Sequence, residues 1–307
     1  MKVLVTTGDF SHYLSPNFHY LLVELAKLVE LTVWYEPGDI QEIIARLESP
    51  PDFIFINEFG ETNTPKITGL GSLSIPFAVA LHDLHYQIAE RKEAINRLNV
   101  QHVFTLYRDS FYEWYPELAE KLHWLPHHAN TDVFKDYGLP KNIDYLFMGA
   151  VHQGVYPLRY RIQQKMKGKP GFVYHEHPGY RNYDDSDDAL VGRNYAREIN
   201  RAKMFLTCNS RYRYTLAKYF EIMACNTLLL APNSKELEDL GLIAGVHFVP
   251  INEADFEEKA EYYLHHEKQC LEIARQGYET VQQHHSTSRR AAQLVAMIED
   301  ILSSASS

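Results

Sequence analysis

The residues best suited to bind a charged ligand lie between positions 208 and 221. Lys218 and Glu221 stand three residues apart, so they share one face of a helix. The preceding segment, residues 208–214, holds an asparagine, a serine and two arginines. A carboxylate can accept both hydroxyl protons of a vicinal diol, and arginines suit a diphosphate. The alternative is a solvated Lys–Glu pair on an ordinary surface helix.

The same stretch has a predictable local structure. Leu216, Phe220 and Met223 are spaced i, i+4 and i+7, which predicts a helix with one apolar face. Asn226 tolerates the left-handed conformation that often ends a helix. Residues 227–231 are β-branched or apolar and predict a strand buried on both faces. Glu221 is therefore expected on a helix that leads into a buried strand.

Residues 219–226, with the sequence YFEIMACN, resemble the "fEimAcG" signature of glycosyltransferases with the GT-B fold. The resemblance is strongest to the group-1 branch that includes spore-maturation-type glycosyltransferases. It implies that Glu221 hydrogen-bonds the ribose hydroxyls of a nucleotide-sugar donor. It also implies an α/β architecture of two Rossmann-like, doubly wound domains that face a cleft.

Composition excludes several other classes of protein. The 307 residues suffice for two domains, and 45% hydrophobic with 23% charged residues is a globular balance. The net charge of −10 argues against gripping nucleic acid or anionic lipid by bulk electrostatics. Three cysteines without a CxxC pair indicate reduced thiols and a cytoplasmic location. No signal leader and no membrane-spanning stretch are expected.

Strands and helices alternate in two series, which predicts parallel sheets wound on both faces. The first series has strands expected at 3–6, 31–35, 53–57, 77–81 and 103–106. The second begins at Asp144, and residues 135–142 are the expected linker because they contain Gly138 and Pro140. We therefore predict an acceptor domain over 1–138 and a donor domain over 143–285. The resemblance implies that an amphipathic helix over 286–302 packs back on the first domain.

Ligands of open α/β sheets bind beyond the carboxyl ends of the strands, so residues that follow strands are site candidates. Gly8 follows the first strand, where the chain must turn and can approach a ligand. His82 and Asp83 end the strand 77–81, and group-1 glycosyltransferases often carry the pair "HD" there. The resemblance implies that His82 approaches the transferred sugar. The alternative is a capping Asp beside a packed His.

In the second series, residues 147–149 resemble the family's "FvG", which is followed by an arginine. Relatives often have a basic residue directly after this glycine, where this chain has Ala150. The wider family also has a glutamate eight residues before the ribose-binding one, where this chain has Arg213. We predict His82, Asp83 and Arg213 as catalytic residues. The residues predicted to bind the nucleotide sugar are Gly8, Gly149, Arg159, Arg161, Asn209, Ser210, Tyr214, Lys218 and Glu221.

No metal site and no cofactor beyond the nucleotide-sugar co-substrate are predicted. Asp185-Ser186-Asp187 matches a DxD metal motif, but it lies in an acidic run that is typical of a solvated loop. His175 and His177 at i, i+2 lack an evident third ligand.

The resemblance implies a hexosyltransferase-type enzyme that retains the anomeric configuration and needs no metal. The donor would be a UDP-, GDP- or dTDP-sugar, and the acceptor hydroxyl would belong to a glycan or a small molecule. Acceptor specificity is expected in the loop 58–74. Two alternatives stay open: a nucleotide-sugar epimerase of the same fold, and a non-catalytic nucleotide-sugar-binding protein. Ala150 and Arg213 keep the second alternative open.

Overall fold

The computed structural model describes residues 1–60, 64–184 and 188–305, and the chain forms two compact units. Unit 1 comprises Met1–Ser11, Phe18–Pro126 and Ser288–Ser307. Unit 2 comprises His12–Asn17 and His127–Thr287. The expected linker, residues 135–142, therefore lies inside unit 2, and a short segment from near the N-terminus belongs to that unit as well.

Unit 1 is built on a parallel sheet with the strand order β2-β1-β4-β6-β7-β8. Its strands are β1 (Lys2–Thr6), β2 (Glu30–Trp34), β4 (Phe53–Asn57), β6 (Phe77–Leu81), β7 (His102–Thr105) and β8 (Leu122–Trp124). Two short strands, β3 (Gly38–Asp39) and β5 (Ile67–Thr68), pair with each other outside this sheet. The strand order reverses between β1 and β4, so the carboxyl ends of these two strands flank the switch point.

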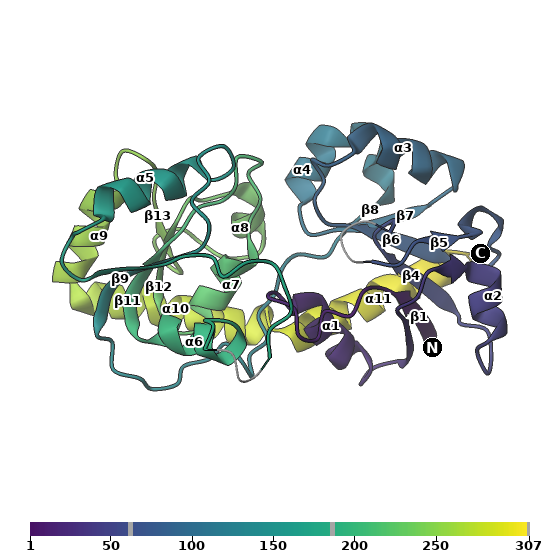
Figure 1. Ribbon diagram of the computed structural model, residues 1–307, viewed down its shortest axis with the longest axis horizontal. Helices are drawn as coiled ribbons and strands as arrows, with labels where there is room; N and C mark the ends of the chain where they lie inside the picture. The colour runs from purple at the N-terminus through teal and green to yellow at the C-terminus, as the bar shows by residue number, and fades with distance from the viewer. Residues whose placement is uncertain (61–63, 185–187, 306–307) are drawn as a thin grey trace. The chain divides into compact units, whose positions relative to one another are not determined.

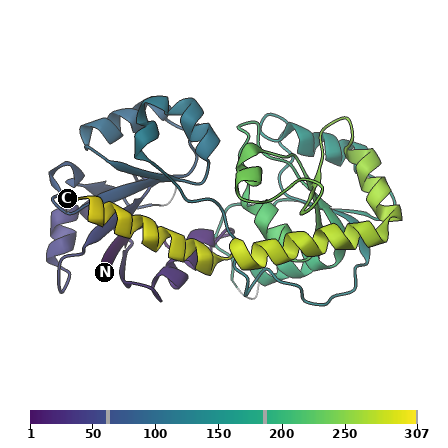
Figure 2. The same cartoon turned by 180° about the vertical axis from the view of Figure 1, so that it is seen from behind.

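Helices cover both faces of this sheet (Figure 1). The helices of unit 1 are α1 (Asn17–Leu25), α2 (Ile40–Ala45), α3 (Ile88–Arg97), α4 (Arg108–Trp114) and α11 (Thr287–Ala305), with 3-10 turns at Leu70–Ser72 and Pro116–Lys121. Helices α3 and α4 lie on one face, and α11 crosses the other face beside α1 (Figures 1 and 2). The apolar stripe of α11 packs on Val3 and Phe55 of the sheet through Leu294 and Ile298.

Unit 2 contains a second parallel sheet with the order β10-β9-β11-β12-β13. Its strands are β9 (Ile143–Met148), β10 (Phe172–His175), β11 (Ala202–Leu206), β12 (Leu228–Ala231) and β13 (Val249–Pro250). Its helices are α5 (Pro157–Met166), α6 (Gly192–Asn200), α7 (Ala217–Met223), α8 (Lys235–Asp239), α9 (Phe256–His265) and α10 (Glu267–His284). Helices α5 and α9 lie on one face and α6 and α7 on the other (Figure 1). The switch point lies between β9 and β11.

The local prediction around Glu221 agrees with the structure. Helix α7 ends at Met223, and Asn226 takes the left-handed conformation at φ 52°. Strand β12 is buried along its whole length. The doubly wound α/β architecture is confirmed. Strand β8 and helix α4 were not expected, because their short polar segments carry weak periodicity.

Candidate functional site

The switch point of unit 2 brings together three of the predicted residues. Gly149 directly follows β9 and has a φ of +127°, a conformation that only glycine adopts without strain. A Cβ atom added there would lie 3.5 Å from Nη1 of Arg159 and 3.6 Å from Cε of Lys218. Two cations from α5 and α7 thus approach the backbone at the carboxyl end of β9. A side chain at position 149 would occupy the space beside both of them.

Arg159 is a buried cation. Arg159 is only 3% exposed, and its guanidinium carbon lies 4.1 Å from the ring centroid of Tyr156. Its Nε and Nη2 atoms are buried without a hydrogen-bond partner in the described part of the chain. A buried charge with unpaired donors costs free energy unless a counter-charge accompanies it. The arrangement therefore favours a bound anion next to Arg159.

Lys218 stands beside this arginine on α7. Its ammonium group donates to the hydroxyl of Tyr195 at 3.1 Å and lies 4.8 Å from the centroid of that ring. Burial, and then the charge of Arg159, lower the pKa of Lys218 to about 8, while Glu221 opposes the shift. At neutral pH most molecules keep Lys218 protonated. The ammonium group of Lys218 can therefore pair with an anion at neutral pH. Mild alkali removes its charge and so weakens that pairing.

Glu221 lies one helical turn beyond Lys218 and is 8% exposed. It is therefore not part of a solvated surface pair. Burial raises the pKa of Glu221, and Lys218 together with a hydrogen bond from Asn17 lowers it in part. The amide nitrogen of Asn17 is 3.5 Å from the carboxylate of Glu221. The carboxylate of Glu221 is thus buried within the electrostatic reach of the Lys218 ammonium group.

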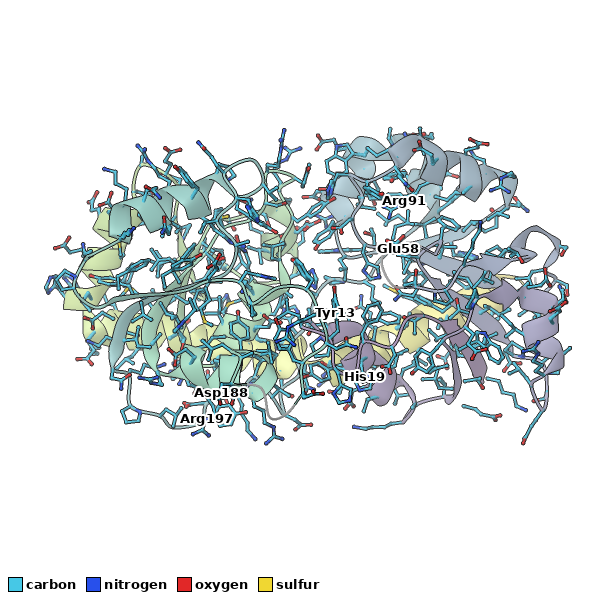
Figure 3. All side chains as sticks on the ribbon, in the orientation of Figure 1. Tyr13, His19, Glu58, Arg91, Asp188 and Arg197 are labelled. Atoms are coloured by element: carbon cyan, nitrogen blue, oxygen red, sulfur yellow. The ribbon has the colours of Figure 1, made fainter. Side chains whose placement is uncertain are left out.

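The segment His12–Asn17 reaches Glu221 as part of unit 2. Tyr13 forms an isolated antiparallel bridge with Asn182, and its ring stacks on Tyr180 with centroids 6.4 Å apart. The backbone nitrogen of Leu14 donates to the carbonyl of Arg181 at 3.1 Å. Tyr13 is labelled in Figure 3. These contacts position Asn17, which the sequence did not single out.

His177 lies two residues beyond β10. Burial lowers the pKa of its imidazole, and the positive charges of Lys218, Arg159 and His152 lower it further. The backbone nitrogen of Gly179 donates to its Nδ1 at 3.0 Å, which leaves the proton of the neutral ring on Nε2. The imidazole can donate a hydrogen bond without adding a third full charge.

The other predicted residues of unit 2 differ in their exposure to solvent. Arg161 is exposed and pairs with Glu253 at 3.2 Å. Arg213 is exposed at a turn with φ 61°, stabilised by a hydrogen bond from its backbone nitrogen to the carbonyl of Ser210 at 2.8 Å. Asn209, Ser210 and Tyr214 occupy the connection between β11 and α7, where Ser210 and Tyr214 are buried.

In unit 1, Asn57 connects the predicted residue His82 to Thr7, the neighbour of Gly8. Its Nδ2 donates to the hydroxyl of Thr7 at 2.8 Å, and its Oδ1 lies 2.5 Å from Nε2 of His82. With the amide in this orientation, His82 carries its proton on Nε2 and keeps a lone pair on Nδ1. Gly8 follows Thr7 and is buried at the end of β1. The carboxyl ends of β1, β4 and β6 thus share one hydrogen-bonded network.

A buried ion pair supports the loop that carries His82. Glu58 and Arg91 are 4% exposed each and meet at 3.0 Å (Figure 3). The second oxygen of Glu58 accepts the backbone N–H of His82 at 2.6 Å, and Arg91 donates to the carbonyl of Asp83 at 2.6 Å. The carboxylate of Asp83 itself belongs to an exposed residue. Sequence reasoning missed Glu58, although a carboxylate directly after the fully buried strand β4 was a usable signal.

Neither histidine of the 175–177 segment gathers metal ligands. Nε2 of His175 lies 2.8 Å from Glu198, and the described residues include no group of three His, Cys, Asp or Glu side chains placed to hold a metal. The motif Asp185-Ser186-Asp187 lies outside the described residues. A cavity of about 490 Å³ is lined by Asp188 and Arg197, which are labelled in Figure 3, and by Asn142 and Arg201, which directly precede β9 and β11. Within the described part of the chain, no helix combines the length and apolarity needed to cross a bilayer.

The chain is similar in sequence to a known family in its second half only. In structure it is similar to known proteins over nearly its whole length. Residues 159–296 match the family model described as "Glycosyl transferase-like". No curated protein matches the chain in sequence. The sucrose-phosphate synthase of Thermosynechococcus elongatus has a TM-score of 0.66 at 12% identity, and 99% of each chain is covered.

Two further structures are similar over comparable lengths. Anabaena HepE in complex with UDP has a TM-score of 0.64 at 10% identity, with 98% of this chain and 100% of that chain covered. A glycosyltransferase from Rickettsia africae has a TM-score of 0.62 at 12% identity, with 98% of each chain covered. At these identities the likeness establishes the fold. The chain therefore has the GT-B fold, and its residues 159–296 match the glycosyl transferase-like family model.

Proposed function

We propose that the protein transfers a hexose from a nucleoside diphosphate sugar to an acceptor hydroxyl. The observation that carries the proposal is the cluster at the unit 2 switch point. Arg159 and Lys218 adjoin Gly149, and Glu221 lies one helical turn away. A donor of this kind offers a diphosphate for the cations and a ribose diol for the carboxylate.

The cations would act on the leaving group. Cleavage of the bond between the sugar and the diphosphate places negative charge on the departing phosphate oxygen. Preorganised cations at that position stabilise the transition state more than the ground state. Arg159 is rigidly buried against Tyr156, and Lys218 is held by Tyr195, so neither needs to reorganise during the reaction. We assign Arg213 a supporting role in turnover, from its place at the loop that leads into α7.

The remaining assignments concern the ribose and the sugar. Glu221 would accept the ribose hydroxyl protons, which replaces the weak 3.5 Å contact with Asn17. Gly8, Asn209, Ser210 and Tyr214 would line the donor, as the sequence indicated. His82 would accept a hydrogen bond from a hydroxyl through its Nδ1 lone pair, because Asn57 fixes the proton on Nε2.

Several finer properties complete the proposal. A UDP-sugar is the first donor to test, because HepE is described in complex with UDP. Residues 219–226 support retention of the anomeric configuration and a place in the spore-maturation-like branch. Arg159 and Lys218, both beside Gly149, would neutralise a diphosphate without a divalent ion, which supports metal-independent transfer. Three buried free cysteines support a reducing, cytoplasmic location.

The test is incubation of the intact chain with UDP-, GDP- and dTDP-hexoses, with and without EDTA, and with glycan and small-molecule acceptors. We expect release of UDP that is insensitive to EDTA, and a large loss of that release in Lys218→Gln. The matched control is Arg161→Gln, which changes an exposed cation two residues from Arg159 and should leave release nearly unchanged.

Other outcomes identify the alternatives. Conversion of the free nucleotide sugar into an isomer would identify an epimerase. Tight donor binding without turnover on any acceptor would identify a non-catalytic binding protein. Absence of binding to all three nucleotide classes would overturn the proposal.

A further inference from the structure

A second candidate binding site lies in unit 1, between α3 on one side and Phe59 with residues 66–70 on the other. It is a cavity of about 460 Å³, within the size range of ordinary small-molecule pockets. One wall is the length of α3, from Glu90 and Arg91 to Arg97, and the other is formed by Phe59 and residues 66–70. The cavity therefore extends along the helix rather than opening as a shallow surface dent.

The lining of this pocket is apolar in its body and basic at its edge. Phe59, Ile67, Leu70 and Leu98 supply apolar side chains. Lys66 and Arg97 are exposed cations that form no ion pair with any residue in the described ranges. Arg91 is neutralised by Glu58, and Glu90 contributes one negative charge. Among the lining residues that the structure describes, positive charge thus exceeds negative charge by one, in a protein whose net charge is −10.

This lining selects a class of ligand. Apolar walls favour an alkyl or aryl body, because its transfer from water is favourable over the area that becomes buried. Two unpaired cations at the edge favour one anionic group and disfavour a cationic ligand. A neutral, fully hydroxylated sugar matches neither feature. The complementary ligand is a small amphipathic anion.

The same wall of the pocket supports the predicted catalytic loop. Arg91, which lines the pocket, donates to the carbonyl of Asp83 at 2.6 Å and to Glu58 at 3.0 Å. Glu58 in turn accepts the backbone N–H of His82 at 2.6 Å. A ligand seated along α3 therefore lies against Arg91, which is labelled with its partner Glu58 in Figure 3. A pocket in this position can present a ligand hydroxyl to the carboxyl edge of the sheet.

We propose that this pocket binds the acceptor, and that the acceptor is a small amphipathic anion whose apolar body lies along α3 while its negative group pairs with Lys66 and Arg97. The acceptor role rests on the proposed glycosyl transfer. The binding site and its ligand chemistry do not, because they follow from the lining alone.

The test uses 8-anilinonaphthalene-1-sulfonate, an aromatic body with one negative group, titrated by fluorescence into the intact chain without donor. We expect saturable binding at one site that weakens as salt rises. Ala94→Trp fills the pocket from α3 and should abolish the saturable binding. The matched control is Ala89→Trp, which places the same side chain on an exposed position of α3 outside the lining. Circular dichroism of each variant establishes that it is folded.

Charge variants test the edge of the pocket. Lys66→Gln and Arg97→Gln should each weaken the probe about threefold, the size expected of an exposed ion pair. Lys92→Gln, on the same helix but outside the lining, should have no effect. Aromatic carboxylates and aromatic phosphates that carry a free hydroxyl are then compared as competitors and as acceptors, which identifies the anionic group preferred.

The outcomes separate the two proposals. Unchanged probe binding in Ala94→Trp overturns the pocket, even if UDP still binds to unit 2. Probe binding that is lost in Ala94→Trp, in a chain that binds no nucleotide, supports the pocket and overturns the glycosyl transfer. Transfer to neutral glycans alone, unaffected by Ala94→Trp, overturns the acceptor role.

Discussion

At the scale of single residues, the chemistry of this chain depends on charges that are kept partly out of water. Arg159 is buried with two unpaired nitrogens, and Lys218 has a pKa of about 8 because burial and Arg159 both oppose its charge. Glu221 has a raised pKa for the corresponding reason. Each of these shifts is reduced when a ligand of the opposite charge arrives, or when a ligand replaces lost hydration. Binding and protonation are therefore linked at this site.

The pKa of Lys218 predicts how donor affinity depends on pH. Above pH ~8 the free protein loses the ammonium charge, whereas bound diphosphate holds the proton. The dissociation constant for UDP-glucose should therefore be flat from pH 6.5 to 7.5 and increase toward tenfold per unit above pH 8. Isothermal titration calorimetry measures this. In Lys218→Gln, binding should be weak and independent of pH, and an unchanged alkaline rise in that variant would assign it to another group.

The carboxylate of Glu221 predicts a ribose-specific defect. Glu221→Gln keeps the shape but loses the charge-assisted hydrogen bonds, so UDP should bind about 10-fold more weakly. The matched ligand is 2′,3′-dideoxy-UDP, which lacks both hydroxyls and should bind the wild-type and variant proteins equally. Equal losses for both ligands would show that Glu221 acts on some other part of the donor.

At the scale of elements, strand ends and helix starts position these groups. The β9–α5 and β11–α7 connections bring Gly149, Arg159 and Lys218 to one switch point, as the order β10-β9-β11 requires. In unit 1 the connection after β6 is fixed by the buried Glu58–Arg91 pair. At the edge of that sheet, β7 and β8 form a parallel ladder and also contact each other through two histidine side chains. Nδ1 of His102 lies 3.0 Å from Nε2 of His123.

This histidine pair predicts a loss of stability in mild acid. Burial, and then His102, lower the pKa of His123 to about 4, and burial lowers that of His102 as well. The unfolded chain takes up protons below pH ~6.5 before the folded chain does. The stabilisation is therefore complete above pH ~6.5 and is lost as the pH falls toward 4. Between pH 7 and 4, the urea midpoint of unfolding should fall less in His123→Phe than in the wild-type protein. His265→Phe, at an exposed position, should leave the dependence unchanged.

At the scale of the whole molecule, the Arg159–Lys218 cluster and the core beneath α11 belong to different compact units. Arg159, Lys218 and Glu221 lie in unit 2, whereas residues 288–305 of α11 complete the core of unit 1. Ile298 is fully buried there against the first sheet. Stability and donor binding should therefore be separable by substitution.

Ile298→Ala tests this separation. The lost contacts and the cavity should reduce the free energy of unfolding by about 2–5 kcal/mol, measured by chemical denaturation. UDP affinity at 20 °C should stay within about twofold, because the donor cluster is in the other unit. The control is Glu299→Ala on the exposed side of α11, where a change within about 0.5 kcal/mol is expected. A large loss of UDP affinity in a folded Ile298→Ala protein would contradict the separation.

The sequence alone determined the alternation of helices and strands and the end of α7. The runs 53–56 and 77–81 are apolar throughout, because strands buried on both faces cannot alternate, and the strands predicted from them, 53–57 and 77–81, match β4 and β6. Asn226 marks the helix end, because few residues tolerate a positive φ. The resemblance of residues 219–226 indicated the GT-B fold, which the structure confirms. Local pattern was sufficient for each of these conclusions.

Only the tertiary structure decided which charges are buried beside Gly149 and which are exposed. Arg159 and Arg161 are two residues apart and were indistinguishable candidates, yet they point about 200° apart around α5. Arg159 is buried beside Gly149 and Lys218, whereas Arg161 is exposed and pairs with Glu253. Likewise, Glu58 and Arg91 are 33 residues apart and meet only through the packing of β4 against α3. Burial and pairing depend on which surface each side chain faces, and that is fixed only when the sheets and helices pack.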